Sequence, residues 1–143
     1  MSTNPTTGTP GVTHFDRSQL LRTARLFAGD PALAGLVDLD APYRTSARLD
    51  ATEHLELWVV GWPVGSATGW HDHLGSEGAF VTVSGVMGEE TWWGTGPEER
   101  VLAPGEGGSF GAGQAHALVN LGDSPALTVH AYSPALRTSG RQR

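Results

Sequence analysis

The 143-residue sequence predicts a mainly β protein, a small barrel or β-sandwich with one or two short helices near its N-terminus. Glycine and proline are abundant, with 20 and 9 residues, so many tight turns are expected and a helical bundle is disfavoured. Short apolar segments separated by turn residues recur at near-regular spacing after residue 53, which is typical of sandwiches and barrels. The length fits one compact domain.

We expect a single domain over residues 14–136, between a polar, disordered tail at 1–13 and a frayed, basic tail at 137–143. The first helix is predicted over residues 19–28, where apolar residues recur at helical spacing. Asp16 and Ser18 are the alternative N-caps, and Gly29 would end the helix. A second short helix is predicted over residues 31–37, with a proline in its first turn.

The period of the pattern changes from residue 54 onward. Leu55, Leu57 and Val59 alternate with residues 54, 56 and 58, which indicates a strand with one buried face. Further short strands are expected at residues 67–71, 79–84, 89–93, 100–102, 108–110, 115–120 and 127–132. Turns rich in glycine and proline separate them.

Charge and composition exclude several classes of function. A formal charge of −6 argues against a nucleic-acid-binding surface. Without cysteine, the chain has no disulfide, thiolate metal site or cysteine nucleophile, so a transition-metal site must use His, Asp or Glu. The sequence has no apolar run of 18 residues and no signal-peptide pattern, so we expect a cytoplasmic protein without a membrane span.

Three histidines form a candidate metal-binding set. His71 and His73 are two residues apart, so in a strand their side chains share a face. His116, from a separate predicted strand, would complete a face of three imidazoles that leaves further positions open to a ligand. The alternative is that His71 and His73 are only half-exposed surface residues of a strand.

Glycines placed around these histidines resemble the two motifs of the cupins, over about residues 60–121. Gly65 and Gly85 frame the first pair, and Gly105 and Gly113 precede His116. The resemblance implies a cupin barrel, also called a double-stranded β-helix or jelly roll, with the metal inside. The sequence departs from the motifs at Gly78, where cupins usually have Glu, with Glu77 one position out of register, and at Gly111, the usual proline position. We therefore expect three imidazole ligands and no carboxylate.

A closer resemblance, over about residues 48–134, is to the cysteine dioxygenase type I family, in particular its bacterial members. It is carried by Gly61-Trp62, by Gly69-Trp70-His71-Asp72-His73, by Gly75-Ser76-Glu77-Gly78-Ala79-Phe80 and by Thr128-Val129-His130-Ala131-Tyr132-Ser133-Pro134. The resemblance implies a cytoplasmic dioxygenase of cysteine catabolism that adds both atoms of O2 to a small thiol, L-cysteine first, and gives the sulfinate.

The same resemblance assigns roles to residues. Fe(II) would be held by His71, His73 and His116. The catalytic row would be Thr128, His130 and Tyr132, with Thr128 where the family usually has Ser. Animal members carry, at the place of Gly78, a cysteine that cross-links to the active-site tyrosine, so Tyr132 is expected to be unmodified here.

The substrate carboxylate calls for an arginine, which can bind it through two parallel hydrogen bonds. Arg48 is the first candidate and Arg44 the alternative. Other readings of the whole chain stay open. The substrate could be 3-mercaptopropionate or another small thiol, the protein could be a non-catalytic cupin that binds a small molecule through its metal, or it could be a different cupin enzyme.

Overall fold

The computed structural model describes residues 15–73, 75–92 and 95–136. The predicted tails at 1–13 and 137–143 lie outside these residues, as does His14. Two helical elements are followed by eight strands: α1 Arg17–Ala28, the 3₁₀ helix η1 Leu33–Leu36, β1 Thr45–Ala51, β2 Glu56–Trp62, β3 Glu77–Ser84, β4 Met87–Trp92, β5 Pro97–Leu102, β6 Gly107–Phe110, β7 His116–Asn120 and β8 Ala126–Ser133.

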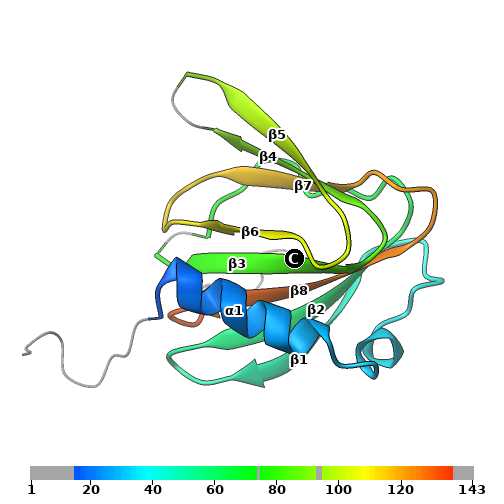
Figure 1. Ribbon diagram of the computed structural model, residues 1–143, viewed down its shortest axis with the longest axis horizontal. Helices are drawn as coiled ribbons and strands as arrows, with labels where there is room; N and C mark the ends of the chain where they lie inside the picture. The colour runs from blue at the N-terminus through cyan, green and yellow to red at the C-terminus, as the bar shows by residue number, and fades with distance from the viewer. Residues whose placement is uncertain (1–14, 74, 93–94, 137–143) are drawn as a thin grey trace, which may run out of the picture.

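The strands form two antiparallel sheets (Figure 1), of five strands in the order β1-β2-β8-β3-β6 and of three in the order β5-β4-β7. This confirms the predicted mainly β class and the double-stranded β-helix architecture. Strand β8 lies at the centre of the larger sheet, between β2 and β3. A side chain on its inner face is therefore surrounded by both neighbours and by the smaller sheet.

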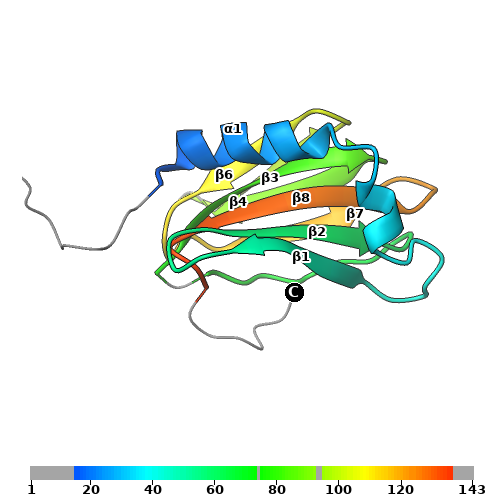
Figure 2. The same cartoon turned by 90° about the horizontal axis from the view of Figure 1, so that it is seen from below.

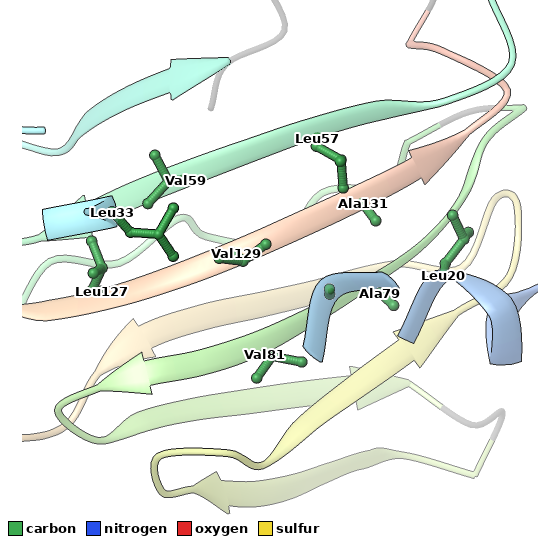
Figure 3. Packing of buried hydrophobic residues seen from close by; sticks show 10 residues of the cluster. Leu20, Leu33, Leu57, Val59, Ala79, Val81, Leu127, Val129 and Ala131 are labelled. Carbon is green, nitrogen blue, oxygen red and sulfur yellow. The ribbon is translucent and has the colours of Figure 1, made fainter. Parts of the chain in front are cut away.

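Helix α1 covers the outer face of the larger sheet (Figure 2). Asp16 caps it, as one of the two predicted alternatives: its side chain accepts a hydrogen bond from the Gln19 N–H at 2.8 Å, and the Gln19 side chain accepts from the Asp16 N–H. Leu20 and Ala24 of the helix are fully buried, and the helix packs against β3 and β8; Figure 3 shows Leu20 in this cluster. The second predicted helix is shortened to the single 3₁₀ turn η1, which contains the weak helix former Gly35.

A second apolar cluster lies between the sheets and shows that one prediction was wrong. The alternation in β2 predicted one buried face, yet six of its seven residues are buried. Leu57 and Val59 join the cluster under α1, whereas Val60 and Trp62 join the cluster to which both sheets contribute. The strand is covered on both faces because helix α1 lies over Leu57 and Val59, and the smaller sheet covers the side that the alternation left to solvent.

Two further predictions need correction. Strand β1 was not predicted, although Ala47 and Leu49 of its sequence alternate with polar residues, and it pairs only with β2 at the edge of the sheet. The strand predicted at 67–71 is reduced to two isolated bridges, Ala67 to Val119 and His71 to His116. Between them Gly69 has a φ of 73°, and Leu118 N–H donates to the Thr68 hydroxyl instead of to a backbone carbonyl.

Candidate metal centre

His71, His73 and His116 converge at one end of the space between the sheets. Among the described residues they form the group able to hold a metal ion, with one ligand atom from each imidazole and all of these atoms within 4.8 Å of one another. The Nε2 atoms of His73 and His116 are 3.4 Å apart. The group contains no carboxylate, in line with the expectation from Gly78.

Backbone pairing brings the ligands from distant parts of the chain together. His71 and His116 exchange two backbone hydrogen bonds, of 3.0 and 2.9 Å, as an antiparallel bridge. The Nδ1 of His71 lies 3.1 Å from the carbonyl oxygen of Gly69. Because a carbonyl can only accept, we assign the imidazole hydrogen to Nδ1, which leaves Nε2 as the atom with a lone pair. The turn at Gly69 therefore orients this ligand.

The electrostatics of the centre favour a neutral His71. Burial is the main cause that lowers the pKa of His71 below its ordinary value of 6.5, and the positive charges of His116 and Arg44 lower it further. The hydrogen bond to Gly69 and the charge of Asp72 act in the opposite direction. A neutral imidazole is the form that binds a metal ion, so the lowered pKa of His71 favours metal binding by this residue at neutral pH.

A carboxylate that sequence reasoning missed supports His116. Glu89 of β4 is buried, and its Oε2 lies 2.9 Å from His116 Nδ1. Its other oxygen accepts a hydrogen bond from Arg100 of β5. The sequence signal was slight, because a glutamate 27 residues before a histidine has no recognisable spacing.

The second predicted group forms a row on the inner face of β8. Thr128 Oγ1 lies 2.8 Å from His130 Nε2, and His130 Nδ1 lies 3.4 Å from the Tyr132 hydroxyl. Trp62 of β2 extends the row, because its indole N–H donates to Thr128 Oγ1 at 2.8 Å. Period-two alternation explains the shared face. The contact of Trp62 could not be predicted from the sequence, since it joins residues 66 positions apart.

A small cavity connects the two groups. It is lined by the three clustered histidines, His130, Tyr132, Arg44, Trp58, Val60, Trp62, Thr68 and Leu118. Its volume is about 60 Å³. Because a single water needs roughly 10–15 Å³ on the same scale, the cavity suits a ligand of a few heavy atoms.

The two candidate arginines lie in different environments in the structure. Arg44 lines the cavity, and its guanidinium lies 5.1 Å from the centre of the Trp62 ring. Arg48 does not line it: its Nη1 lies 3.6 Å from Glu56 Oε2, its guanidinium lies over Trp58, and its side chain is 55% exposed. The geometry brings Arg44 to the three imidazoles and leaves Arg48 outside.

Glycine at position 78 is explained by the ring of Phe110. Gly78 is paired with Phe110 and with Tyr132 on its two sides. A Cβ atom at this position would overlap Phe110 Cζ and would lie 3.0 Å from Tyr132 Cδ1. The place next to Tyr132 is therefore filled by an aromatic side chain of β6.

Substitution of Gly78 by alanine is expected to destabilise the fold by about 1–3 kcal/mol through overpacking. Thermal unfolding followed by circular dichroism should show a Tm lower by several degrees, at about 3 °C per kcal/mol for a domain of this size. Gly75→Ala is the matched control, since its added Cβ has no atom within 4 Å. Equal Tm values for both variants would contradict the packing argument.

A double-stranded β-helix with three converging imidazoles defines the chain as a metal-dependent cupin. The sequence profile of the family described as cysteine dioxygenase type I matches residues 29–142. The chain belongs to this family, as its motifs predicted. A comparison with curated proteins finds no match.

Solved structures support the fold. The chain is similar to TT1209 from Thermus thermophilus, with 24% identity, a TM-score of 0.63 and 71% of this chain and 93% of that one covered. A protein with a double-stranded β-helix domain from Klebsiella pneumoniae has 18% identity, a TM-score of 0.63 and coverages of 74% and 90%. An oxalate oxidase in complex with glycolate has 18% identity, a TM-score of 0.64 and coverages of 78% and 62%. Within the described ranges, none of the helices has the length and apolar character to cross a membrane.

Proposed function

We propose that the protein is a non-haem Fe(II) dioxygenase of small thiols, with L-cysteine as the first candidate substrate and 3-sulfinoalanine as the product. Both atoms of O2 enter the sulfur, so the thiol loses four electrons and O2 gains them. The observation that carries the proposal is one small cavity with three imidazoles, a cation and a tyrosine in its wall. Membership of the cysteine dioxygenase type I family adds to it.

The donor set fits a divalent transition metal. His71, His73 and His116 would hold the ion through neutral nitrogens, which leave its positive charge unbalanced. Fe(II), when bound, would supply a site for the thiolate and the electrons that activate O2. The identity of the metal comes to this chain from the family, since three imidazoles also suit other ions.

The charges in the cavity wall favour an anionic substrate. Arg44 lines the cavity, and the described lining residues include no Asp or Glu. A guanidinium can bind a carboxylate through two parallel hydrogen bonds. We therefore assign the carboxylate of the substrate to Arg44 and leave Arg48 as the alternative.

The row on β8 would orient a proton donor. The Trp62 indole can only donate, so Thr128 Oγ1 accepts from it and can donate its own hydrogen to His130 Nε2. A neutral His130 then carries its hydrogen on Nδ1, towards the Tyr132 oxygen. In this arrangement the Tyr132 hydroxyl donates into the cavity, where it would stabilise charge that develops on oxygen or sulfur.

Tyr132→Phe is expected to lower kcat about tenfold and to leave the metal content unchanged, because it removes a hydrogen-bond donor but no metal ligand. Oxygen consumption and metal analysis of the same sample measure the two quantities. Tyr43→Phe is the control, since the exposed Tyr43 is not among the residues that line the cavity. A Tyr132→Phe variant with full kcat would remove Tyr132 from the proposed chemistry.

Oxygen uptake by the Fe(II)-loaded protein tests the proposal. We expect cysteine and 3-mercaptopropionate, which both carry a carboxylate, to stimulate uptake more than cysteamine, with one O2 consumed per thiol and a sulfinate as the product. A higher kcat/KM for 3-mercaptopropionate would make it the preferred substrate. If no thiol stimulates uptake while the metal stays bound, the second candidate, a non-catalytic cupin that binds a small anion through its metal, replaces the dioxygenase.

A further inference from the structure

Glu89 is a buried carboxylate that neither the family motifs nor the proposed reaction uses. Its side chain has no exposed surface. One oxygen faces His116 Nδ1 and the other accepts from Arg100 Nη2, at 2.5 Å. A buried carboxylate is costly unless it is paired and hydrogen-bonded, so the two contacts explain how Glu89 is tolerated here.

The register of the smaller sheet fixes these contacts. Glu89 lies directly opposite Arg100 on β5 and Leu118 on β7. His116 is opposite Thr91, the next residue on the same face of β4, so Glu89 and His116 are diagonal neighbours. The carboxylate therefore reaches its two partners from the middle strand of the sheet without any loop.

The surroundings of Gly108 are a second observation on the pair Glu89 and Arg100. A Cβ atom at this position of β6 would lie within van der Waals overlap of the Arg100 Nη2 atom and 2.8 Å from Glu89 Oε1. Because residue 108 of β6 is glycine, the larger sheet leaves room for the guanidinium of Arg100. The guanidinium is half-exposed, whereas the carboxylate behind it is fully enclosed.

The hydrogen-bond inventory gives His116 a defined tautomer. An ionised carboxylate only accepts and an arginine only donates. His116 Nδ1 must then carry the hydrogen, and its Nε2, which lies 3.4 Å from His73 Nε2, presents the lone pair to the metal site. The Nδ1–H tautomer of His71 is set by the neutral carbonyl of Gly69, whereas that of His116 is set by the charged carboxylate of Glu89.

We propose that Glu89 is a positioning residue that, held by Arg100, locks His116 in the Nδ1–H form and so strengthens metal binding at the three-histidine site. Hydrogen bonds of this kind to a metal-bound imidazole fix the ring and raise its basicity. Loss of such a partner typically weakens metal binding 10- to 100-fold. The inference rests only on the metal-binding part of the proposed function.

The first test uses the unchanged protein. Nitrogen-15 NMR of the metal-free chain at pH 8 distinguishes the two tautomers of each histidine by the chemical shifts of the ring nitrogens. We expect His116 to be in the Nδ1–H form, although the imidazole of a free histidine prefers the Nε2–H form. A His116 that is mainly Nε2–H would overturn the proposal. No variant has to fold for this measurement.

The second test is Glu89→Gln. The Gln amide offers one acceptor and one donor group, while Arg100 and His116 both present donors. Because arginine cannot lose its proton, the amide oxygen should turn to Arg100 and the NH2 to His116, which favours the Nε2–H tautomer. We expect the Kd for Co2+, measured by its visible absorption, to rise 10- to 100-fold and the spectrum to change.

Glu90→Gln is the matched control, because Glu90 is the next residue of β4, on its other face, opposite Glu99. It removes the same charge and should leave the Kd and the spectrum of Co2+ unchanged. A folded Glu89→Gln protein with a Kd within threefold of wild type would overturn the proposal. Co2+ binding needs no thiol and no turnover, so this result is separate from a failure of the proposed dioxygenase, which shows as absent oxygen uptake in a protein that binds metal.

Discussion

Replacement of Arg44 by glutamine is expected to raise the KM for cysteine about 100-fold and to leave kcat within about threefold. Loss of one partner from an enclosed charge pair costs about 2–5 kcal/mol, and 100-fold corresponds to about 2.7 kcal/mol. The guanidinium lines the cavity beside the Trp62 ring. The substrate carboxylate would then lie in an apolar wall without a cation, while the chemistry at sulfur would be unchanged.

Steady-state oxygen uptake over a range of thiol concentrations measures this effect, and the choice of thiol makes it specific. The KM for 3-mercaptopropionate should rise in parallel, since it shares the carboxylate, whereas the kinetics with cysteamine should not worsen. Arg48→Gln is the matched control, because Arg48 pairs with Glu56 outside the cavity and should change the KM less than threefold. The reverse outcome, with a large effect at Arg48 only, would return the carboxylate to that residue.

The two arginines show where sequence reasoning reaches its limit. Residues 44 and 48 are an even number of positions apart, so period-two alternation cannot separate them. Their places relative to β1 decide between them, because Arg48, within the strand, is opposite Trp58 and next to Glu56, whereas Arg44, which precedes the strand, lines the cavity with the imidazoles. The start of β1 and its pairing with β2, which determine these places, were not predicted.

Sequence patterns within a few residues were sufficient to predict the elements that depend mainly on neighbouring residues. The helix cap at Asp16, the helix end at Ala28 and most strands follow from patterns within a few residues. The wrong predictions involve distant partners: β2 is covered on its second face by the smaller sheet, and the strand before His71 is interrupted at Gly69. Tertiary contacts override the local pattern in both cases.

The residues of the candidate site also fall into those that the sequence could identify and those that it could not. His71, His73 and His116 could be selected because the spacing in the first pair and the glycine frame are visible in the sequence, and the structure brings all three together. Glu89 and Trp62 could not, because each acts through a cross-strand or cross-sheet contact. Predicting them requires the register of β4 against β7 and the order of β2 and β8.

His71→Ala is expected to weaken metal binding at least about 100-fold and to abolish thiol-dependent oxygen uptake at micromolar metal. A four-ligand zinc site gains about 10–16 kcal/mol, so one ligand contributes about 3 kcal/mol, which corresponds to more than 100-fold. His71 is half-buried at the end of the barrel, and its removal leaves His73 and His116 in place. Metal analysis after anaerobic purification and Co2+ titration measure the loss.

The control for this variant is His54→Ala, since the side chain of His54 lies beside Glu53, away from the cluster. It should retain full metal content, so that a loss specific to His71 reports ligation and not a general effect of a missing imidazole. Millimolar imidazole should partly restore metal binding to His71→Ala, because the free base can occupy the half-exposed place that the side chain leaves. A His71→Ala protein that holds the metal as wild type does would exclude His71 as a ligand. The proposed dioxygenase would then lose the three-imidazole set that leaves the positive charge of the ion available to an anionic thiolate.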